Sequence, residues 1–553
     1  MKILFIVPLD HMTFNNVIYI MPLGLLSLAT ILKENNEDVE IIDFNYLFLN
    51  KMVEYSNDQV KNMETMVEYI LGKSPDIIGF TGVCSTFHNV LFLSSLIKDK
   101  DNHIKIMLGG PQTSSLSKEI LQMFPWIDLI CVGEGENKIS AIIKGLERND
   151  LTDVAGITYR NNGMILQNTD MPLIEDLDAL PLLNYTLSPG GYTGGNVSME
   201  ITRGCPYNCI FCSTSQFWKR RFRTKSIERI CKEIAIIKEI SHKDKLFVSF
   251  IDDNFTTDYN FTMKLCHSLQ KLDIKWDCSA RIDTVDDELI KQMALAGCAG
   301  IFLGIESGSP RIQKYIKKNL NLEQVNPLID TMIKYNIKPI VSFMYGFPEE
   351  TEEDLNLTLN MLYSVLKKGS HRTQLQCLCI LPGTQLFNQY KDKLVFKDCH
   401  SSLTDNYIFE SCNSFIIENR EIFPNLYVLE NTLADKYPHL DRFVTFIFTH
   451  LYRFFPETLN LILNLFENNL LTFYNDFLFT ADGLSDYWIT EDYRKDLTGT
   501  AGLTKKAIAF LTEYINNKSF NDFSFKIISH KFCAEKSNMI TVYKDSQKRE
   551  DEK

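Results

Sequence analysis

Short apolar runs alternate with amphipathic segments in the first quarter of the chain. The run Lys2–Val7 is apolar after its first residue and ends at Pro8, as expected of a strand buried on both faces of a parallel sheet. Residues 22–32 follow, with a proline at the first position and apolar residues at helical spacing. This alternation predicts a doubly wound α/β domain over residues 1–145. The further predicted strands are Val39–Asp43, Ile77–Phe80, Ile104–Leu108 and Leu129–Val132.

Glycines, hydroxyl groups and acids occupy the predicted carboxyl ends of these strands, where such a domain binds its ligand. Glycine allows a ligand to approach the backbone, and hydroxyl groups offer hydrogen bonds. Turns of this composition are also ordinary strand exits, so both readings stay open. No G-x-G-x-x-G follows the first strand, which disfavours a dinucleotide. The candidate ligand-binding residues are Thr81, Ser85, Thr86, Gly109, Gly110, Gln112, Thr113, Gly133, Glu134, Gly135 and Glu136.

Residues 146–190 break this pattern. Asp153–Tyr159 and the turn Asn161–Gly163 predict a small hairpin, and a stretch with several prolines and glycines follows. We interpret this region as a connector between two domains.

Six strand-then-helix units follow over residues 191–395. A closed (β/α)8 barrel needs eight such units, so six predict an open, TIM-type partial (β/α)6 barrel whose chemistry lies at the carboxyl ends of its strands. The predicted strands are Val197–Thr202, Leu246–Ile251, Lys275–Ala280, Ala299–Gly304, Lys338–Phe343 and Thr373–Ile380.

Aromatic residues crowd the remaining region, residues 396–553. Their spacing of three and four residues between positions 443 and 477 predicts amphipathic helices. We expect a mainly helical domain that closes the open barrel and shapes substrate access.

Three thiols within eight residues follow the first barrel strand, at Cys205, Cys209 and Cys212. A disulfide is disfavoured, because an odd set cannot pair and no signal peptide is evident. A structural zinc site would need a fourth ligand, and no second pair follows at finger spacing. Three soft thiolates instead suit an iron–sulfur cluster.

This C-x3-C-x2-C spacing, with Phe211 before the last cysteine, resembles the signature of the radical S-adenosylmethionine (SAM) superfamily. The resemblance implies a 4Fe–4S cluster on Cys205, Cys209 and Cys212, with SAM bound to the iron that lacks a protein ligand. It also implies SAM contacts from the carboxyl ends of later strands, which include the turn Gly304–Gly308 of the form G-x-E-S-G. The SAM residues implied in this way are Phe211, Asp252, Asp253, Arg281, Glu306, Ser307 and Gly346. For the two aspartates, helix capping is the structural alternative, and Arg281 has a core acid as its alternative partner.

The first domain resembles the Rossmann-like cobalamin-binding domain that precedes many radical SAM cores. Its G-G-P-x-T and G-E-G-E turns would then line the corrin and its nucleotide tail. The D-x-H-x-x-G sequence that supplies a histidine below cobalt is absent, so we predict that neither His11 nor His88 ligates cobalt. A tRNA methylthiotransferase resembles the same core but usually carries more cluster cysteines, whereas residues 1–150 hold only Cys84 and Cys131.

Together these resemblances imply a cobalamin-dependent radical SAM enzyme. The commonest activity in that family is C-methylation of an unactivated carbon, through a 5′-deoxyadenosyl radical and methylcobalamin. We therefore expect a C-methyltransferase acting on a peptide or a small natural product, with an external electron donor of flavodoxin or ferredoxin type. A cyclase or rearrangement enzyme without methyl transfer remains an alternative, as does a non-catalytic iron–sulfur or zinc scaffold.

Net charge bears on the partners. The 553 residues carry a formal charge of −13 without a basic tail, which argues against nucleic acid. The one basic run, Lys219–Arg223, is either a solvated loop or a site for an anionic group of a cofactor. No apolar stretch is long enough to span a membrane. We expect a cytoplasmic protein with reduced thiols.

Overall fold

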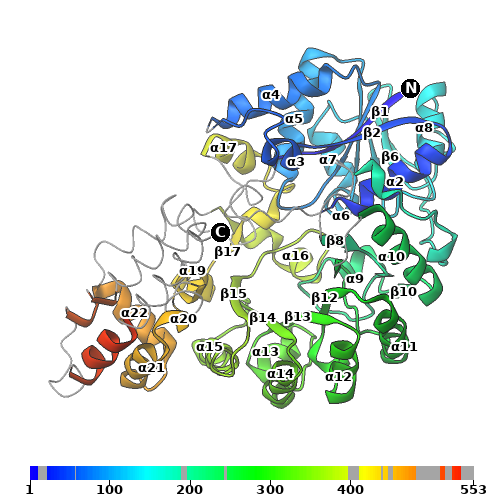
Figure 1. The fold of residues 1–553 in the computed structure, drawn as a ribbon. Coiled ribbons are helices and arrows are strands. Elements are labelled where there is room, and N and C mark those ends of the chain that lie inside the picture. The colour runs from blue at the N-terminus through cyan, green and yellow to red at the C-terminus, as the bar shows by residue number, and fades with distance from the viewer. Residues whose placement is uncertain are drawn as a thin grey trace.

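The computed structural model contains two parallel sheets with a helical region beside the second (Figure 1). The first domain, blue to cyan, lies above the green barrel, and the helices of the C-terminal part lie beside the barrel. The structure describes residues 1–9, 21–56, 58–188, 196–241, 246–396, 410–437, 440–445, 447, 452–480, 511–512, 514–516 and 526–536.

The first sheet has the strand order β2-β1-β3-β4-β5-β6-β7, and its first five strands run parallel. The predicted doubly wound domain is thereby confirmed. The order 2-1-3-4-5 is a common doubly wound arrangement with its switch point between β1 and β3. The parallel strands are β1 (Lys2–Val7), β2 (Asp38–Asp43), β3 (Ile77–Thr81), β4 (Lys105–Gly109) and β5 (Leu129–Cys131).

The hairpin predicted in the connector extends this sheet. Strands β6 (Ile157–Asn161) and β7 (Met164–Gln167) pair with each other, and β6 pairs antiparallel with β5, with Leu129 opposite Tyr159. The first sheet therefore continues beyond residue 145.

Helices cover both faces of the first sheet. Side chains alternate along β1, so Ile3 and Phe5 pack with α2 and α8, whereas Leu4 and Ile6 pack with α4 and α5. The helices of this domain are α2 (Leu23–Glu34), α3 (Phe44–Leu49), α4 (Gln59–Leu71), α5 (Phe87–Lys100), α6 (Pro111–Ser115), α7 (Ser117–Met123) and α8 (Ile139–Arg148).

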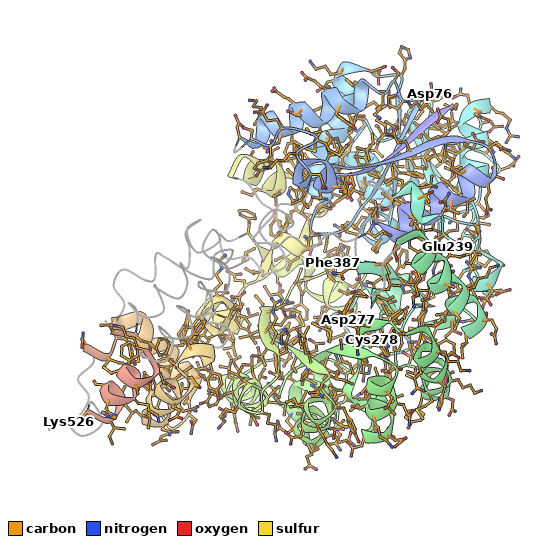
Figure 2. The ribbon with its side chains drawn as sticks, viewed as in Figure 1. Asp76, Glu239, Asp277, Cys278, Phe387 and Lys526 are labelled. Atoms are coloured by element: carbon orange, nitrogen blue, oxygen red, sulfur yellow. The ribbon has the colours of Figure 1, made fainter. Side chains whose placement is uncertain are left out.

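The second sheet is an open, fully parallel barrel with the order β15-β14-β13-β12-β11-β8, which confirms the six predicted units. Neighbouring residues on its strands face opposite sides. Cys278 is buried against the outer helices, whereas its neighbour Asp277 is only half-buried (Figure 2). The strands are β8 (Asn196–Met199), β11 (Phe247–Phe250), β12 (Lys275–Ala280), β13 (Cys298–Glu306), β14 (Lys338–Tyr345) and β15 (Arg372–Cys377).

Helices between these strands form the outer layer of the barrel (Figure 1). Apolar residues on their inner faces, such as Ile234, Leu265 and Leu355, join one continuous core with the sheet. These helices are α10 (Ile227–Ser241), α11 (Tyr259–Leu269), α12 (Asp287–Leu295), α13 (Pro310–Tyr315), α14 (Val325–Lys334) and α15 (Glu352–Lys367). Helix α16 (Gln385–Tyr390) follows the last strand and lies on the side of the barrel that faces the first domain.

The C-terminal region is helical, as predicted, and contacts both domains. Phe415 of α17 packs against Phe92, with 4.6 Å between the ring centroids, on the first domain. Helix α19 packs along β15, the edge strand of the barrel. No helix in the part of the chain that the structure describes is long and apolar enough to cross a membrane. The helices are α17 (Glu410–Glu418), α18 (Leu433–Lys436), α19 (Leu440–Thr445), α20 (Tyr452–Phe454), α21 (Pro456–Leu465) and α22 (Leu470–Thr480), and β16 (Leu394–Val395) pairs with β17 (Val428–Leu429).

Candidate functional site

The three thiols lie on a loop whose two ends are held together. Strands β9 (Thr202–Arg203) and β10 (Arg223–Thr224) form an antiparallel ladder, and residues 204–222 between them are the cysteine loop, which contains helix α9 (Thr214–Phe217). The loop begins at Gly204 with a φ of +90°. A Cβ at this position would lie 2.0 Å from the carbonyl oxygen of Arg221, so glycine is required there.

Two acids that follow β11 anchor this loop. Asp252 is buried, and its Oδ1 accepts hydrogen bonds from the backbone N–H of Ile201 at 3.0 Å and from the hydroxyl of Thr202 at 2.9 Å. Asp253 accepts from the N–H of Gly204 at 3.1 Å and from the hydroxyl of Thr214 at 3.2 Å. These contacts fix the start of the loop and the helix α9 within it. The resemblance implied SAM contacts for both aspartates, and the structure gives both a role in loop anchoring.

The thiols themselves are partly exposed. Burial raises the pKa of Cys205 to about 11. Burial also raises the pKa of Cys209, and the Lys318 and Arg281 cations partly offset this effect. Protonated thiols of this kind lose their protons when they bind iron. Among the described residues, no three His, Cys, Asp or Glu side chains converge on one point that could hold a metal ion. An iron–sulfur cluster needs no such convergence, because each thiolate binds a different iron, and the donor set fits it.

Arg281 lies directly behind the cysteine loop. Its guanidinium donates to both carboxylate oxygens of Asp283 at 2.9 and 2.8 Å and to the carbonyl of Lys318 at 2.9 Å. It also stacks on Tyr207, 3.7 Å from the ring centroid, with Nη1 3.8 Å from the Sγ of Cys209. The acid that pairs with Arg281, Asp283, is exposed and does not lie in the core, and the predicted SAM contact of Arg281 stays a prediction.

Glu306 ends β13 in an unusual backbone conformation. It has a φ of +70° beside a register shift between Gly304 and Glu306, and such strain in a residue other than glycine is typical of functional sites. Its carboxylate accepts from the Lys318 ammonium at 2.6 Å. Phe211, also implied in SAM binding, packs edge-to-face on Phe347 at 6.2 Å between centroids.

Ser307 and Gly346 have little open surface. Ser307 is fully buried, and its hydroxyl lies 3.0 Å from that of Thr358. Gly346 has a φ of +87°, and a Cβ there would meet the Cβ of Ala434 at 3.0 Å. The predicted SAM residues thus fall on one edge of the barrel, but Ser307 packs into the scaffold and a C-terminal residue covers Gly346.

Glu350, beside Gly346, makes stability depend on pH. Its Oε2 accepts from the Gly346 N–H at 2.6 Å, and burial raises its pKa from 4.5 to about 8. Between these values the unfolded chain releases a proton that the folded chain keeps, so the free energy of unfolding falls as pH rises from about 4.5 to 8. Glutamine does not titrate, so Glu350→Gln should remove the contribution of this carboxyl to the decline. That contribution is up to a few kcal/mol of the free energy of unfolding.

Urea unfolding of wild type and Glu350→Gln at pH 5, 6.5 and 8 checks this. Glu323→Gln, an exposed acid on the barrel surface, is the matched control. An equal decline in Glu350→Gln and wild type would contradict the assignment.

A pocket of about 230 Å³ opens at the carboxyl edge of the first sheet. Its lining is mostly apolar and includes Gly24 and Gly133, where a Cβ would meet no atom within 4 Å. A side chain at either position would therefore fill the space that a ligand needs. The opposite wall comes from the barrel and the cysteine loop, through Glu200, Arg203, Phe217 and Trp218.

The structure brings seven of the predicted cobalamin residues to this pocket. Four others do not line it: Thr86 and Thr113 are buried, Ser85 is half-buried, and Gln112 donates to the carbonyl of Ile422 at 2.7 Å. His88 is fully buried and does not line the pocket, and His11 lies outside the described residues. The seven that line it are Thr81, Gly109, Gly110, Gly133, Glu134, Gly135 and Glu136.

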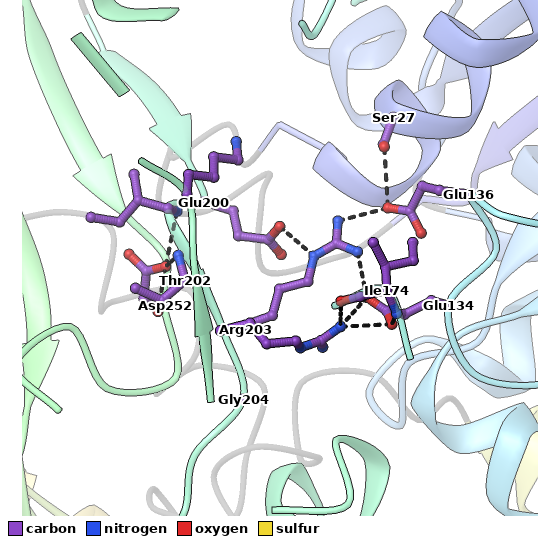
Figure 3. A network of polar contacts seen from close by, with 12 residues as sticks. Ser27, Glu134, Glu136, Ile174, Glu200, Thr202, Arg203, Gly204 and Asp252 are labelled. Atoms are coloured by element: carbon purple, nitrogen blue, oxygen red, sulfur yellow. Dashed lines mark hydrogen bonds and ion pairs between the residues drawn. The ribbon is translucent and has the colours of Figure 1, made fainter. Parts of the chain in front are cut away.

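An ion-pair network of Glu134, Glu136, Arg203 and Arg223, all buried or nearly so, with the half-buried Glu200 at its side, joins the two domains. Figure 3 shows Arg203 between Glu200 and the two acids of the first domain. Arg203 donates to Glu134, Glu136 and Glu200, each at 2.7 Å. Arg223 donates to Glu134 at 2.9 Å. The carboxylates of the G-E-G-E turn therefore bind arginines of the barrel at the edge of the pocket.

Sequence reasoning missed this network. The basic run gave a signal for Arg223, but neither predicted alternative describes it: Arg223 is buried against Glu134, whereas Arg221 forms an exposed pair with Glu175. Arg203 stands next to the cysteine motif without a pattern that indicates its partners. Trp218, which lies under both buried guanidinium groups at 5.8 and 5.1 Å, was missed as well.

Comparison with known proteins identifies both domains. The family model for the B12 binding domain matches residues 18–143, and the model for the radical SAM superfamily matches residues 199–362. An uncharacterized methyltransferase of Pyrococcus horikoshii is 30% identical over 397 residues, which cover 70% of this chain and 82% of that protein. The anaerobic magnesium-protoporphyrin IX monomethyl ester cyclase of Synechocystis is 27% identical, over 62% of this chain and 68% of that protein.

A solved structure shows the same fold. The cobalamin-dependent S-adenosylmethionine radical enzyme OxsB, with aqua-cobalamin and S-adenosylmethionine bound, has a TM-score of 0.59 at 17% identity and covers 98% of this chain and 84% of that one. The two family models, the methyltransferase relative and this fold agree with the thiol loop and the glycine-walled pocket. The chain therefore belongs to the cobalamin-dependent radical SAM enzymes of the methyltransferase type, which use a 4Fe–4S cluster, S-adenosylmethionine and cobalamin.

Proposed function

We propose that this enzyme is a C-methyltransferase that modifies an unactivated carbon of a peptide or a small natural product. The observation that carries this proposal is the shared wall of the pocket. Glycine turns of the first domain form one side of the pocket, and Arg203, Phe217 and Trp218, next to or within the cysteine loop, form the other. A methyl donor in this pocket would lie beside the site where a carbon radical is generated, and proximity of this kind is what group transfer requires.

The residues divide by role in this proposal. Cys205, Cys209 and Cys212 hold the iron–sulfur cluster, and Asp252 and Asp253 hold their loop in place. When bound, the cluster and SAM supply a radical that abstracts hydrogen, and cobalamin supplies the methyl group. The protein's own contribution is to position these groups and to exclude water.

SAM would lie at the carboxyl edge of the barrel, between the cysteine loop and the ends of β11 to β14. Phe211, Asp253 and Glu306 are the proposed contacts, and Gly346, which Ala434 covers, shapes the turn beside them. Arg281, Asp252 and Ser307 support this site from behind, because their side chains are engaged with Asp283, Thr202 and Thr358. Reduction of the cluster needs an external donor, for which a flavodoxin or a ferredoxin is proposed.

Cyclisation or rearrangement without methyl transfer is the second candidate. It is favoured by the 27% identity to a protein named as a magnesium-protoporphyrin cyclase. The third alternative, a non-catalytic scaffold, is dropped because the chain belongs to an enzyme family.

Anaerobic reconstitution with iron, sulfide and hydroxocobalamin tests the proposal. We expect 5′-deoxyadenosine and S-adenosylhomocysteine to form together with a product that is heavier by about 14 Da per methyl group. A product without this gain and without S-adenosylhomocysteine would favour the cyclase. If a protein with a full complement of iron releases no 5′-deoxyadenosine, both the methyltransferase and the cyclase proposals are contradicted.

A further inference from the structure

The ion-pair network contains more charge than a buried site usually holds. Three carboxylates and two guanidinium groups meet there, and the side chains of Glu134, Arg203 and Arg223 are 2%, 8% and 4% exposed. Two further donors of Arg223, Nε and Nη2, are buried and have no acceptor among the residues that the structure describes. Buried ion pairs seldom stabilise a fold more than apolar packing of the same volume does, and their best-attested use is to fix one arrangement.

The arrangement that this network fixes is the position of the cysteine loop. Arg203 and Arg223 are opposite each other on the β9–β10 ladder and stand at the two ends of the loop. Both donate to the single carboxylate of Glu134, across 69 and 89 residues of sequence. Both ends of the loop are therefore attached to one turn of the first domain.

That turn also belongs to the pocket. Glu134 and Glu136 line the pocket next to Gly133 and Gly135. The Trp218 ring lies under both guanidinium groups, and Trp218 also lines the pocket. A ligand that shifts the glycine turn must shift the arginines that hold the loop, because charge-assisted hydrogen bonds join the two.

We infer that Arg203, Arg223 and Glu134 are positioning residues that couple occupancy of the cobalamin pocket to the geometry of the cysteine loop, and hence to SAM binding. This inference rests on the proposed function only in that SAM binds at the loop. Each ligand then changes the affinity of the other by the same factor, because such coupling is reciprocal. The network is thus the connection by which the two cofactor sites act together.

Equilibrium dialysis of radiolabelled SAM tests the coupling without any substrate. The Kd of SAM is measured on anaerobic, iron-loaded protein with and without saturating hydroxocobalamin. We expect a ratio of at least about fivefold in wild type. In Glu134→Gln a neutral amide replaces the carboxylate, so the charge-assisted hydrogen bonds from both guanidinium groups are lost. The ratio of the two SAM Kd values should then fall to about one, while iron content stays unchanged.

Arg221→Gln is the matched control, because Arg221 lies in the same loop but pairs with Glu175 on the surface, where both side chains are more than half exposed. It should keep the wild-type ratio. Trp218→Phe is the second variant, in case Glu134→Gln fails to load iron, since it keeps every ion pair of the network while it alters the stacking surface and removes the indole N–H beside Asp253. We expect its ratio to lie between those of wild type and Glu134→Gln.

A wild-type ratio of one would overturn the inference, and so would a wild-type ratio that persists in Glu134→Gln. Where Glu134→Gln carries no iron, an unchanged ratio in Trp218→Phe overturns it and a reduced ratio supports it. Failure of the proposed function is distinguishable, because it is seen in the products of wild-type protein, as missing S-adenosylhomocysteine or missing 5′-deoxyadenosine, whatever the ratio.

Discussion

Replacing Cys205, Cys209 or Cys212 with alanine should lower the rate of 5′-deoxyadenosine release by on the order of a thousandfold or more, which is about 4 kcal/mol of activation free energy. Each thiolate binds a different iron, so none of the three can substitute for another. The loop itself should keep its shape, because Asp252, Asp253 and the β9–β10 ladder hold it without the thiols. The measurement is product release under anaerobic conditions, together with iron content and the absorbance of the cluster.

Cys231→Ala is the control for this prediction. Cys231 is a half-buried thiol on α10, on the outer layer of the barrel, and its loss should leave the release rate within about twofold, as surface changes generally do. Normal release from any of the three loop variants would contradict the assignment of the iron ligands.

A bulky side chain at position 24 should abolish cobalamin binding. Gly24 lies in the first turn of α2, lines the pocket and has open space where a Cβ would stand. Gly24→Phe would place an aromatic ring in that space without a backbone clash. We expect the Kd of hydroxocobalamin, measured by absorbance titration, to rise by about a hundredfold or more, because a loss of about 3 kcal/mol of contacts corresponds to that factor.

Gly24→Ala separates pocket filling from a change in the helix. A methyl group is too small to fill the pocket, so cobalamin binding should stay within about threefold of wild type. Alanine should also raise the free energy of unfolding by up to about 1 kcal/mol, since glycine inside a helix is unfavourable by that amount. If Gly24→Phe binds hydroxocobalamin as tightly as wild type does, the corrin does not bind in this pocket.

The ion-pair network gives these two sites a common boundary. Glu134 contributes to the pocket wall through its turn and to the cysteine loop through Arg203 and Arg223. The predicted loss of cobalamin binding in Gly24→Phe should therefore remove the effect of hydroxocobalamin on SAM affinity as well. The Kd of SAM measured in its absence should stay as in wild type.

The amino-acid sequence by itself determined the strands, the helices and the cluster motif. Buried parallel strands such as Lys2–Val7 are continuous apolar runs, and six such units in one region suffice to indicate an open barrel. The spacing of Cys205, Cys209 and Cys212 is equally local, because all three lie within eight residues of one loop. Hydrophobic periodicity and cysteine spacing depend only on residues that are close in sequence, so they are visible without knowledge of the tertiary structure.

Only the tertiary structure decided which polar groups meet. Asp252, for which SAM binding or helix capping was predicted, accepts a hydrogen bond from Thr202. Gln112 of the first domain donates to the carbonyl of Ile422 across 310 residues. Glu134 likewise pairs with arginines of the other domain. A buried charge needs an opposite charge close to it in space, and the separation of two residues along the chain does not indicate whether they are close.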